Sequence, residues 1–208
     1  MINVTITPTI ATVAAGLVTA TTIGSQTVTS SALFGSVVVG QKVHGIGIPF
    51  GTTVTAVAST SSITISKPAT ATGTPTLQFS YFAATAYTAG DCLGWPFEMT
   101  LNRLDGIFVV DKAKQIVAVK LYIFNAPPAT PTLDNAAFAP ADADAANIIG
   151  YHSLTGTVAL TASQVIFPAA AELPLPLVTG SKMYGQLVVV GTPTFATVGD
   201  IVLNLSGE

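Results

Sequence analysis

The chain has 208 residues, and charged side chains make up only 8% of them, against roughly 25% in an average soluble domain. Half of the residues are apolar, yet Gly, Pro, Thr, Ser or a charge interrupts every apolar run before the roughly 20 residues that a membrane-spanning helix needs. A formal net charge of −3 provides no basic field for nucleic acid, so we expect neither a membrane nor a nucleic acid as partner.

The charges are distributed unevenly along the chain. Before Asp91 there is no acidic residue, and Lys42 and Lys67 are the only charged side chains. A surface so poor in charge stays soluble through Thr and Ser hydroxyls or is covered by neighbouring chains. Coverage suits a protein that works inside an assembly. The first basic residue is Lys42, so the positive segment of a signal peptide is missing and we expect no export by that route.

Residues 1–82 predict a small β module of meander or barrel-like form. Hydroxyl residues alternate with β-branched apolar residues, a pattern that places one side of each strand in a core and the other in water. Gly and Pro at turn positions separate these runs. The Ala-rich stretch Ile10–Thr21 lacks helix caps, and we expect it to be irregular or a strand. The predicted strands are Asn3–Thr7, Gln26–Thr29, Thr53–Val57, Ser62–Ser66 and Thr76–Phe79.

Residues 83–208 predict a β-sandwich of jelly-roll type, which makes the whole chain all-β. Strands here are longer and more apolar, and turn signals recur about every ten residues. One short helix is expected at Pro140–Ile149, with acids in its first turn and with Ile148 and Ile149 facing the core. The predicted strands are Phe97–Leu101, Gly106–Val110, Gln115–Asn125, Thr157–Leu160, Gln164–Phe167, Met183–Val190 and Ile201–Leu205.

Catalytic chemistry is not indicated, and we predict that the protein is not an enzyme. The two histidines, His44 and His152, lie in no recognisable catalytic setting, and a nucleophile elbow is missing. The glycine-rich stretch Gly45–Gly51 fails the spacing of a dinucleotide loop, since Pro49 and a Thr-rich strand follow instead of a helix. Cys92 is the only cysteine and is expected to be structural.

Carboxylates near residue 140 raise the question of a hard cation such as calcium. Asp134, Asn135, Asp142 and Asp144 supply oxygen ligands, but their spacing is not that of an EF-hand loop. Acids at a helix start also favour the helix dipole, which explains Asp142 and Asp144 without a metal. We predict no metal and no cofactor, and a cation at Asp134, Asp142 and Asp144 stays the open alternative.

Two stretches resemble proteins of bacteriophage particles. The first joins VGQKVHGIGIPFGTTVTAV at residues 39–57 to ITISKPATATG at residues 63–73. It is similar to a small β module that recurs in phage and prophage structural proteins and in some bacterial surface proteins. The second comprises residues 104–106, 111–115, 121–125 and 134–144, and it resembles a family of phage virion proteins whose genes sit among head genes. These resemblances imply a virion structural protein of the head-decoration (cement) type.

The function expected first is therefore a capsid decoration protein, made in the host cytoplasm and bound to the outer surface of the head. Its expected partners are the major capsid protein or other virion proteins, and copies of itself in a trimer. The uncharged segment Met1–Thr9 is predicted to add as a strand to a neighbour's sheet, and the proline-rich segment Leu173–Val178 to lie in a contact. The predicted interface residues are Met1, Ile2, Val4, Ile6, Leu173, Leu175 and Leu177.

Two alternatives remain open. The first keeps the protein in the virion as a head fibre, collar or tail accessory protein. The second is a bacterial surface adhesin or carbohydrate-binding module, in which Trp95, Tyr87 and Tyr151 would stack on sugars. The sequence favours Trp95 as a core residue that leads into a strand.

Overall fold

The structure is a computed structural model, which describes residues 2–6, 12–13, 17–31, 34–81, 85–116, 118–129, 132–168, 175–176, 182–197 and 199–207. The chain divides into two compact units, one formed by residues 1–12 together with 82–208 and the other by residues 13–81. The first strand thus belongs to the larger unit. Its composition had grouped it with the Thr-rich module, and that assignment was wrong.

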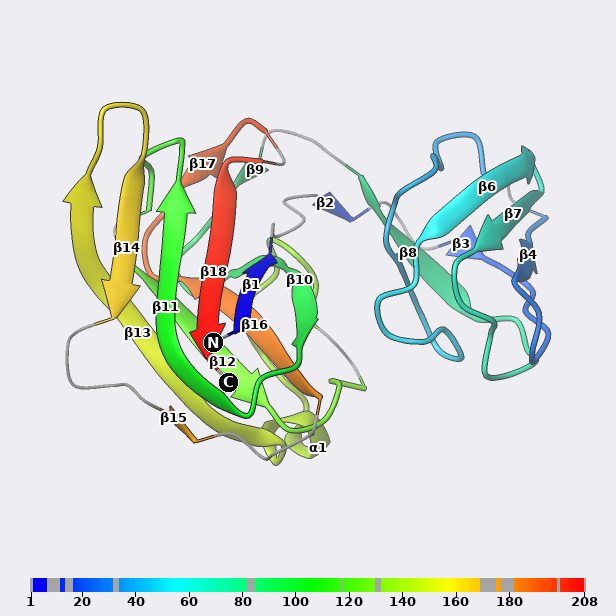
Figure 1. Ribbon diagram of the computed structural model, residues 1–208. Coiled ribbons are helices and arrows are strands. Elements are labelled where there is room, and N and C mark those ends of the chain that lie inside the picture. Colours follow the sequence, from blue (N-terminus) through cyan, green and yellow to red (C-terminus); the bar gives the residue numbers. More distant parts are fainter. Residues whose placement is uncertain are drawn as a thin grey trace. The chain divides into compact units, whose positions relative to one another are not determined.

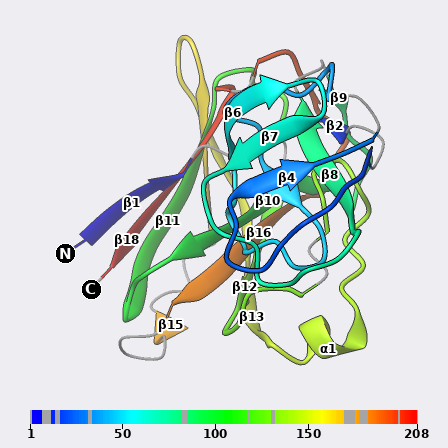
Figure 2. The ribbon, with the colours of Figure 1, turned by 90° about the vertical axis from the view of Figure 1, so that its right-hand side faces the viewer.

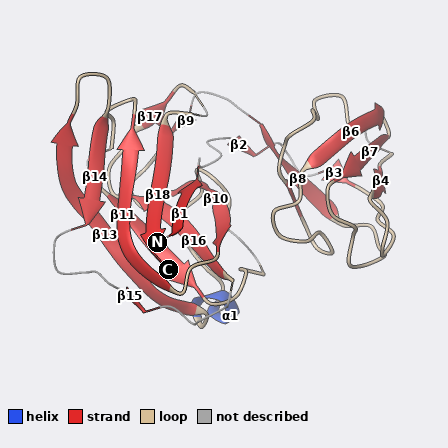
Figure 3. Cartoon of the chain, viewed as in Figure 1, coloured by secondary structure: helices blue, strands red, loops and turns tan. Residues whose placement is uncertain are grey.

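Both units are built almost entirely of strands, so the predicted all-β class is confirmed (Figure 3). Among its described residues, the larger unit contains eight main strands. They are β1 (Ile2–Ile6), β10 (Cys92–Met99), β11 (Arg103–Asp111), β12 (Val119–Phe124), β13 (Ile148–Ala159), β14 (Gln164–Pro168), β16 (Met183–Val189) and β18 (Ile201–Gly207). Three shorter strands accompany them, namely β9 (Thr85–Ala86), β15 (Leu175–Pro176) and β17 (Thr194–Phe195).

The eight strands follow jelly-roll connectivity. They lie in the order β1-β18-β11-β14-β13-β12-β16-β10, and their pairings are antiparallel. Counted along the chain, the first strand pairs with the eighth, the second with the seventh, the third with the sixth and the fourth with the fifth. This nesting is that of two Greek keys in a sandwich. β1, β18, β11 and β14 form one layer, and β10, β16, β12 and β13 form the other (Figures 1 and 2).

Alternation along the strands fills the space between these layers. In β18, Ile201, Leu203 and Leu205 are buried, and the residues between them are only half-buried. The same alternation sends Ile107 and Val109 of β11 into one apolar cluster with them. Side chains of successive strand residues point to opposite sides, so the residues between these belong to the outer side of the layer.

The turn that leads from β11 toward β12 is organised by one buried carboxylate. Asp111 is fully buried, and its oxygens accept hydrogen bonds from the backbone N–H groups of Ala113 at 2.9 Å, Gln115 at 2.7 Å and Ile116 at 2.7 Å. The Nε2 of Gln164 donates a fourth bond at 2.9 Å. A buried charge is tolerated only where donors replace its water, so this turn depends on Asp111.

The one helix of the described chain, α1, spans Asp142–Ala145 and is shorter than predicted. Ala146 is its C-cap, and Ile148 already begins β13 opposite Phe124. Ile149 is 39% exposed, so the expectation that it faces the core was wrong. Ile148 and Ile149 are in strand β13 instead of the helix, because β13 pairs with β12 from Ile148 onward. No helix in the described part of the chain is long and apolar enough to cross a membrane.

The smaller unit consists of short strands. They are β2 (Thr12–Val13), β3 (Leu17–Val18), β4 (Thr27–Thr29), β5 (Val43–His44), β6 (Val54–Ser59), β7 (Ser62–Ile65) and β8 (Thr76–Tyr81). They form a three-stranded sheet, β4-β7-β6, and a second sheet in which β8 pairs with β2, β3 and β5. Both sheets contribute to one apolar core around Val28, Ile63, Leu77 and Phe79. Strands are confirmed at β4, β6, β7 and β8. Alternating burial is confirmed in β4, β7 and β8, whereas in β6 only Val54 is buried and Val57 is exposed.

Candidate functional site

The outer side of the layer that contains β12, β16 and β10 is covered by the chain itself. The connection between β12 and β13, residues 125–147, is held to the edge strand β10. Cys92 donates its N–H to the carbonyl of Ala136 at 2.8 Å, and Asn135 donates to the carbonyl of Cys92 at 2.9 Å. The ring of Phe138 lies on Tyr122, with 4.3 Å between the ring centroids. This layer therefore offers little free surface under its own connection.

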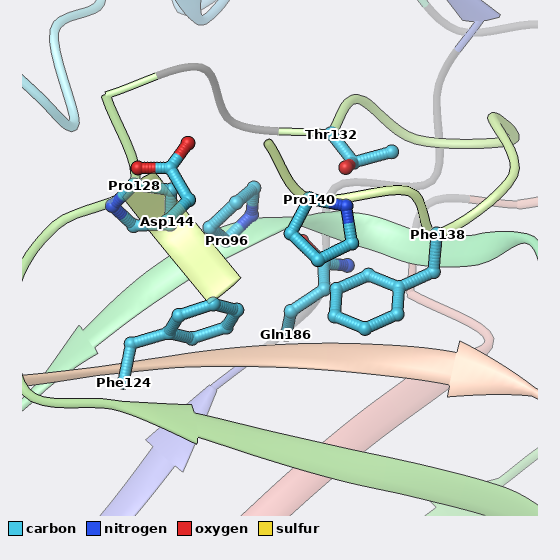
Figure 4. A pocket seen from close by; sticks show the side chains of 8 residues that line it. All are labelled: Pro96, Phe124, Pro128, Thr132, Phe138, Pro140, Asp144 and Gln186. Atoms are coloured by element: carbon cyan, nitrogen blue, oxygen red, sulfur yellow. The ribbon is translucent and has the colours of Figure 1, made fainter. Parts of the chain in front are cut away.

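A small pocket lies between this connection and the sheet (Figure 4). Its volume is about 10 Å³, and about 10–15 Å³ is the space that a single water molecule needs. No organic ligand or cofactor fits there unless the connection moves away. The lining residues are Pro96, Phe124, Pro128, Thr132, Phe138, Pro140, Asp144 and Gln186.

Asp134, one of the possible cation ligands, is used within the protein. It is buried, and its carboxylate accepts hydrogen bonds from the Tyr87 hydroxyl at 2.8 and 3.0 Å and from the Gly94 N–H at 2.5 Å. Burial and the neighbouring Asp134 raise the pKa of Tyr87 far above its usual value, so this hydroxyl stays a donor. The arrangement fastens residues 132–138 onto the sandwich.

The other two acids do not join Asp134 in a metal site. Asp144 is buried and accepts the N–H of Ala129 at 2.8 Å, whereas Asp142 is exposed on α1. Within the described ranges, no group of three or more His, Cys, Asp or Glu side chains is placed to hold a metal ion. Asp134 and Asp144 each accept hydrogen bonds from protein donors, so both acids stabilise the fold.

Cys92 is buried beside these acids, which makes a testable difference to its reactivity. Burial first, and then the charges of Asp134 and Asp91, raise the pKa of the thiol to about 12. The attacking species is the thiolate, and the raised pKa leaves roughly one thiol in ten thousand ionised at pH 8. Iodoacetamide at pH 8 should therefore alkylate folded protein at least a thousandfold more slowly than protein unfolded in urea, as followed by intact mass. Rapid labelling of folded protein would show that the thiol is accessible and ionised.

The histidines and the aromatic residues considered for sugar stacking are dispersed. His44 lies in β5 of the smaller unit, and burial lowers the pKa of its imidazole. His152 is buried in β13 of the larger unit. Trp95 and Tyr87 are also buried, whereas Tyr151 is 57% exposed. The structure therefore brings neither the histidines nor these three aromatic residues together into one site.

The outer side of the opposite layer, together with the end of β13 that pairs with β14, carries apolar side chains. Four valines form one row across four adjacent strands: Val202 of β18 is opposite Val110 of β11, which is opposite Val165 of β14, which in turn is opposite Val158 of β13. Residues opposite each other in a ladder project from the same side of the sheet. Valine residues in a row across four strands give a continuous apolar strip.

A second row lies beside the first. Val109 and Ile166 are opposite each other, which places Phe108 opposite Phe167. Beyond them the row continues to Asn204 on one side and to Gly156 on the other. The exposed fractions are 42% for Phe108, 38% for Phe167 and 49% for Val158. We name this surface the apolar face, and it comprises Phe108, Val110, Val158, Val165, Phe167 and Val202.

The apolar face contains no charge, and its surroundings are polar. At one end of β11 lie Arg103 and Asp105, whose side chains pair at 2.5 Å. Near the other end, Lys114 donates to the carbonyl of Thr161 at 2.7 Å. An apolar centre with charged residues at its rim is the usual anatomy of a protein interface. An exposed cluster of large apolar side chains on a soluble protein also marks a place of contact.

The predicted interface residues have different surroundings. β1 pairs with β18 of its own chain, so the expectation that this segment is a free arm for a neighbour's sheet does not match the structure. Val4 and Ile6 are half-buried against the jelly-roll core, and Ile2 is opposite Gly207. Alternation along β1 explains this, because it turns Val4 and Ile6 toward the core on the open edge of β18.

The second predicted contact falls largely outside the described residues. Met1, Leu173 and Leu177 lie outside them, and of Leu175 only the backbone is described, opposite Leu104 in the pairing of β15 with β11. None of the interface residues predicted from the sequence belongs to the apolar face. A signal for it exists in the runs Gly106–Val110 and Gln164–Phe167, where apolar residues occupy both strand parities and so imply that both sides of the strand are apolar.

Comparison of the chain with protein-family models, with curated proteins and with solved structures finds no match. A functional proposal therefore has to come from the surfaces themselves. The jelly-roll unit has one outer side partly covered by its own connection and another that exposes the apolar face.

Proposed function

We propose that this protein is a structural protein of a bacteriophage virion, and that it decorates the outer surface of the head shell. The observation that carries the proposal is the apolar face, in which Phe108, Val158 and Phe167 are exposed in the isolated chain. Burying such a surface against major capsid protein subunits stabilises both partners through the hydrophobic effect. Asp134 and Asp144 hold the connection in place through hydrogen bonds, and the pocket beneath it is small. Both features suit a rigid binding protein.

The size of the apolar face favours binding at several points. Four strands about 4.8 Å apart and two rows about 7 Å apart cover roughly 300 Å². A stable isolated interface buries about 800 Å² on each partner. One such contact is therefore weak by itself, and its strength grows when several contacts are made together. A homo-oligomer, such as the expected trimer, on a shell of repeated subunits provides that multiplicity.

This size argument leads to a binding prediction. Purified protein should bind assembled shells that lack it at least a hundredfold more tightly than it binds isolated capsid subunits, because a shell engages several faces at once. Cosedimentation with shells, and light scattering or analytical ultracentrifugation with the subunits, measure the two affinities. Equal affinity for shells and free subunits would contradict a decoration role.

A head fibre, collar or tail accessory protein would use the same surface chemistry. The number of copies in each particle separates these positions, since a decoration protein covers the whole shell and a collar or fibre protein occupies few sites. Quantitative mass spectrometry of purified particles measures that number.

A saccharide-binding role is a second candidate, favoured by one residue. Tyr151 is exposed and stacks on Tyr122, with 5.5 Å between the ring centroids. The ammonium of Lys120 lies 5.7 Å from the centroid of the Tyr151 ring. An exposed aromatic ring with a fixed orientation is a possible platform for a sugar. If it acts so, a glycan screen gives binding that Tyr151→Ala removes, whereas no binding in the screen together with association with particles retires this role.

A further inference from the structure

The side chain of Gln186 presents a buried acceptor to which no group of the described residues donates. Gln186 lies in β16 and is only 1% exposed. Its Nε2 donates to the carbonyls of Gly94 and Leu187, both at 2.9 Å. These two acceptors fix which end of the amide is nitrogen. Its Oε1 therefore has a fixed direction, and among the described residues no donor reaches it.

Gln186 lines the small pocket under the β12–β13 connection (Figure 4). Pro96 and Phe124 border the pocket from the sheet, and Phe138 and Pro140 border it from the connection. Asp144 and Thr132 are the other residues with polar side chains that line it. A buried acceptor in native proteins nearly always has a partner, which is an ordered water where the protein provides none.

We infer that this pocket binds one ordered water molecule, which donates a hydrogen bond to Gln186 Oε1. The volume of about 10 Å³ matches a single water and excludes a larger occupant. The chemistry agrees, because Gln186 Oε1 is an acceptor and a water molecule can donate a hydrogen bond to it. The three oxygen-bearing side chains are too few for the six to eight ligands of calcium.

The water links two parts of the fold. Gln186 belongs to the sheet, whereas Asp144 and Thr132 belong to the connection that covers it. A bridging water joins such groups almost as well as a direct hydrogen bond does. It therefore belongs to the set of contacts that close this side of the sandwich, beside the hydrogen bonds of Asp134.

A crystal structure of the unmodified protein at about 1.5 Å resolution tests the inference, because ordered waters are visible there. We expect one peak of water-like density about 2.7–3.2 Å from Gln186 Oε1. An empty pocket, or a protein donor on Oε1, overturns the inference. Density with several oxygen contacts near 2.4 Å, the length of a calcium–oxygen contact, overturns it in favour of a cation.

Two variants of Gln186 distinguish the effect of the acceptor atom from the effect of side-chain size. Gln186→Met keeps the length of the side chain and removes the acceptor, and the peak should be lost. Gln186→Glu is nearly isosteric and keeps Oε1. With its acid protonated and donating to a carbonyl in place of Nε2, it should retain the water. Loss of the peak in both variants, or its retention in Gln186→Met, contradicts the role given to Oε1. If either variant fails to fold, the density in the unmodified protein alone tests the inference.

Discussion

Replacing Phe108 and Val158 together by Glu should weaken binding to assembled head shells by a hundredfold or more and leave the chain folded. Both side chains project from the outer side of the sheet and are more than a third exposed, so their loss removes little from the core. In the proposed contact each side chain is buried. A glutamate at either position would lose its hydration without gaining a hydrogen-bond or ion-pair partner, which costs binding free energy. Two lost apolar anchors of about 1.5 kcal/mol or more each account for at least a hundredfold.

The matched control uses the same substitution at two similarly exposed apolar residues away from the apolar face. Ile149→Glu with Val190→Glu adds the same charge, at side chains that are 39% and 46% exposed. Binding of this control should stay within a few-fold of the unmodified protein in the cosedimentation experiment. If both double variants bind equally, the apolar face does not make the contact. Circular dichroism and a thermal melt show that each variant is folded.

Asp111→Ala should destabilise the larger unit by roughly 3–5 kcal/mol, because it leaves buried donors without an acceptor. The backbone N–H groups of Ala113, Gln115 and Ile116 and the Gln164 side chain all donate to this carboxylate. For a unit of this size the Tm should fall by about 10 °C or more. Urea unfolding followed by circular dichroism measures the loss of free energy of unfolding.

Asp200→Ala is the control for that prediction. Asp200 also accepts backbone hydrogen bonds in a turn, from Ala196 at 3.1 Å and Thr197 at 2.9 Å, but these bonds are exposed. Water replaces a lost exposed acceptor, so the cost should stay near 1 kcal/mol. Comparable losses in the two variants would mean that burial of Asp111 is not what makes its turn sensitive.

The individual strands could be predicted because their signal is local. Alternation in β4, β7 and β18 shows which side chains enter the core, and the turn residues delimit each run. The predicted helix was too long for a nonlocal reason. Acids and Pro140 favour a helix start there, but Ile148 pairs with Phe124 of β12, and no local pattern reveals that pairing.

The placement of the first strand shows a similar limit. β1 has the same alternating composition as the strands that follow it, and by composition it belongs with them. Its partner β18 lies at the other end of the chain. Strand pairing depends on complementary edges and registers, and a single sequence does not show which distant edges meet.

The sequence shows the apolar runs that form the apolar face, but it does not show that one side of them is exposed. Runs such as Ile107–Val110 read as buried strands because neither side carries a polar residue. Phe108 and Val110 lie on an outer side that the β12–β13 connection does not cover, because this connection lies over the other layer. A single sequence does not show over which layer a connection lies. The resemblance to phage proteins gives no position for the contact.

The insertion of residues 13–81 between β1 and β10 means that two chain crossings join the smaller unit to the larger one. Proteolysis should reflect this. A single cut leaves the smaller unit attached, either covalently through the other crossing or through β1 and its pairing with β18, and only two cuts release it. Either cut already breaks the covalent link between β1 and the rest of the larger unit, so β1 is then held by its pairing with β18 and by the packing of Val4 and Ile6 against the core. Refolding of the cleaved larger unit therefore becomes a reaction between two molecules and depends on concentration.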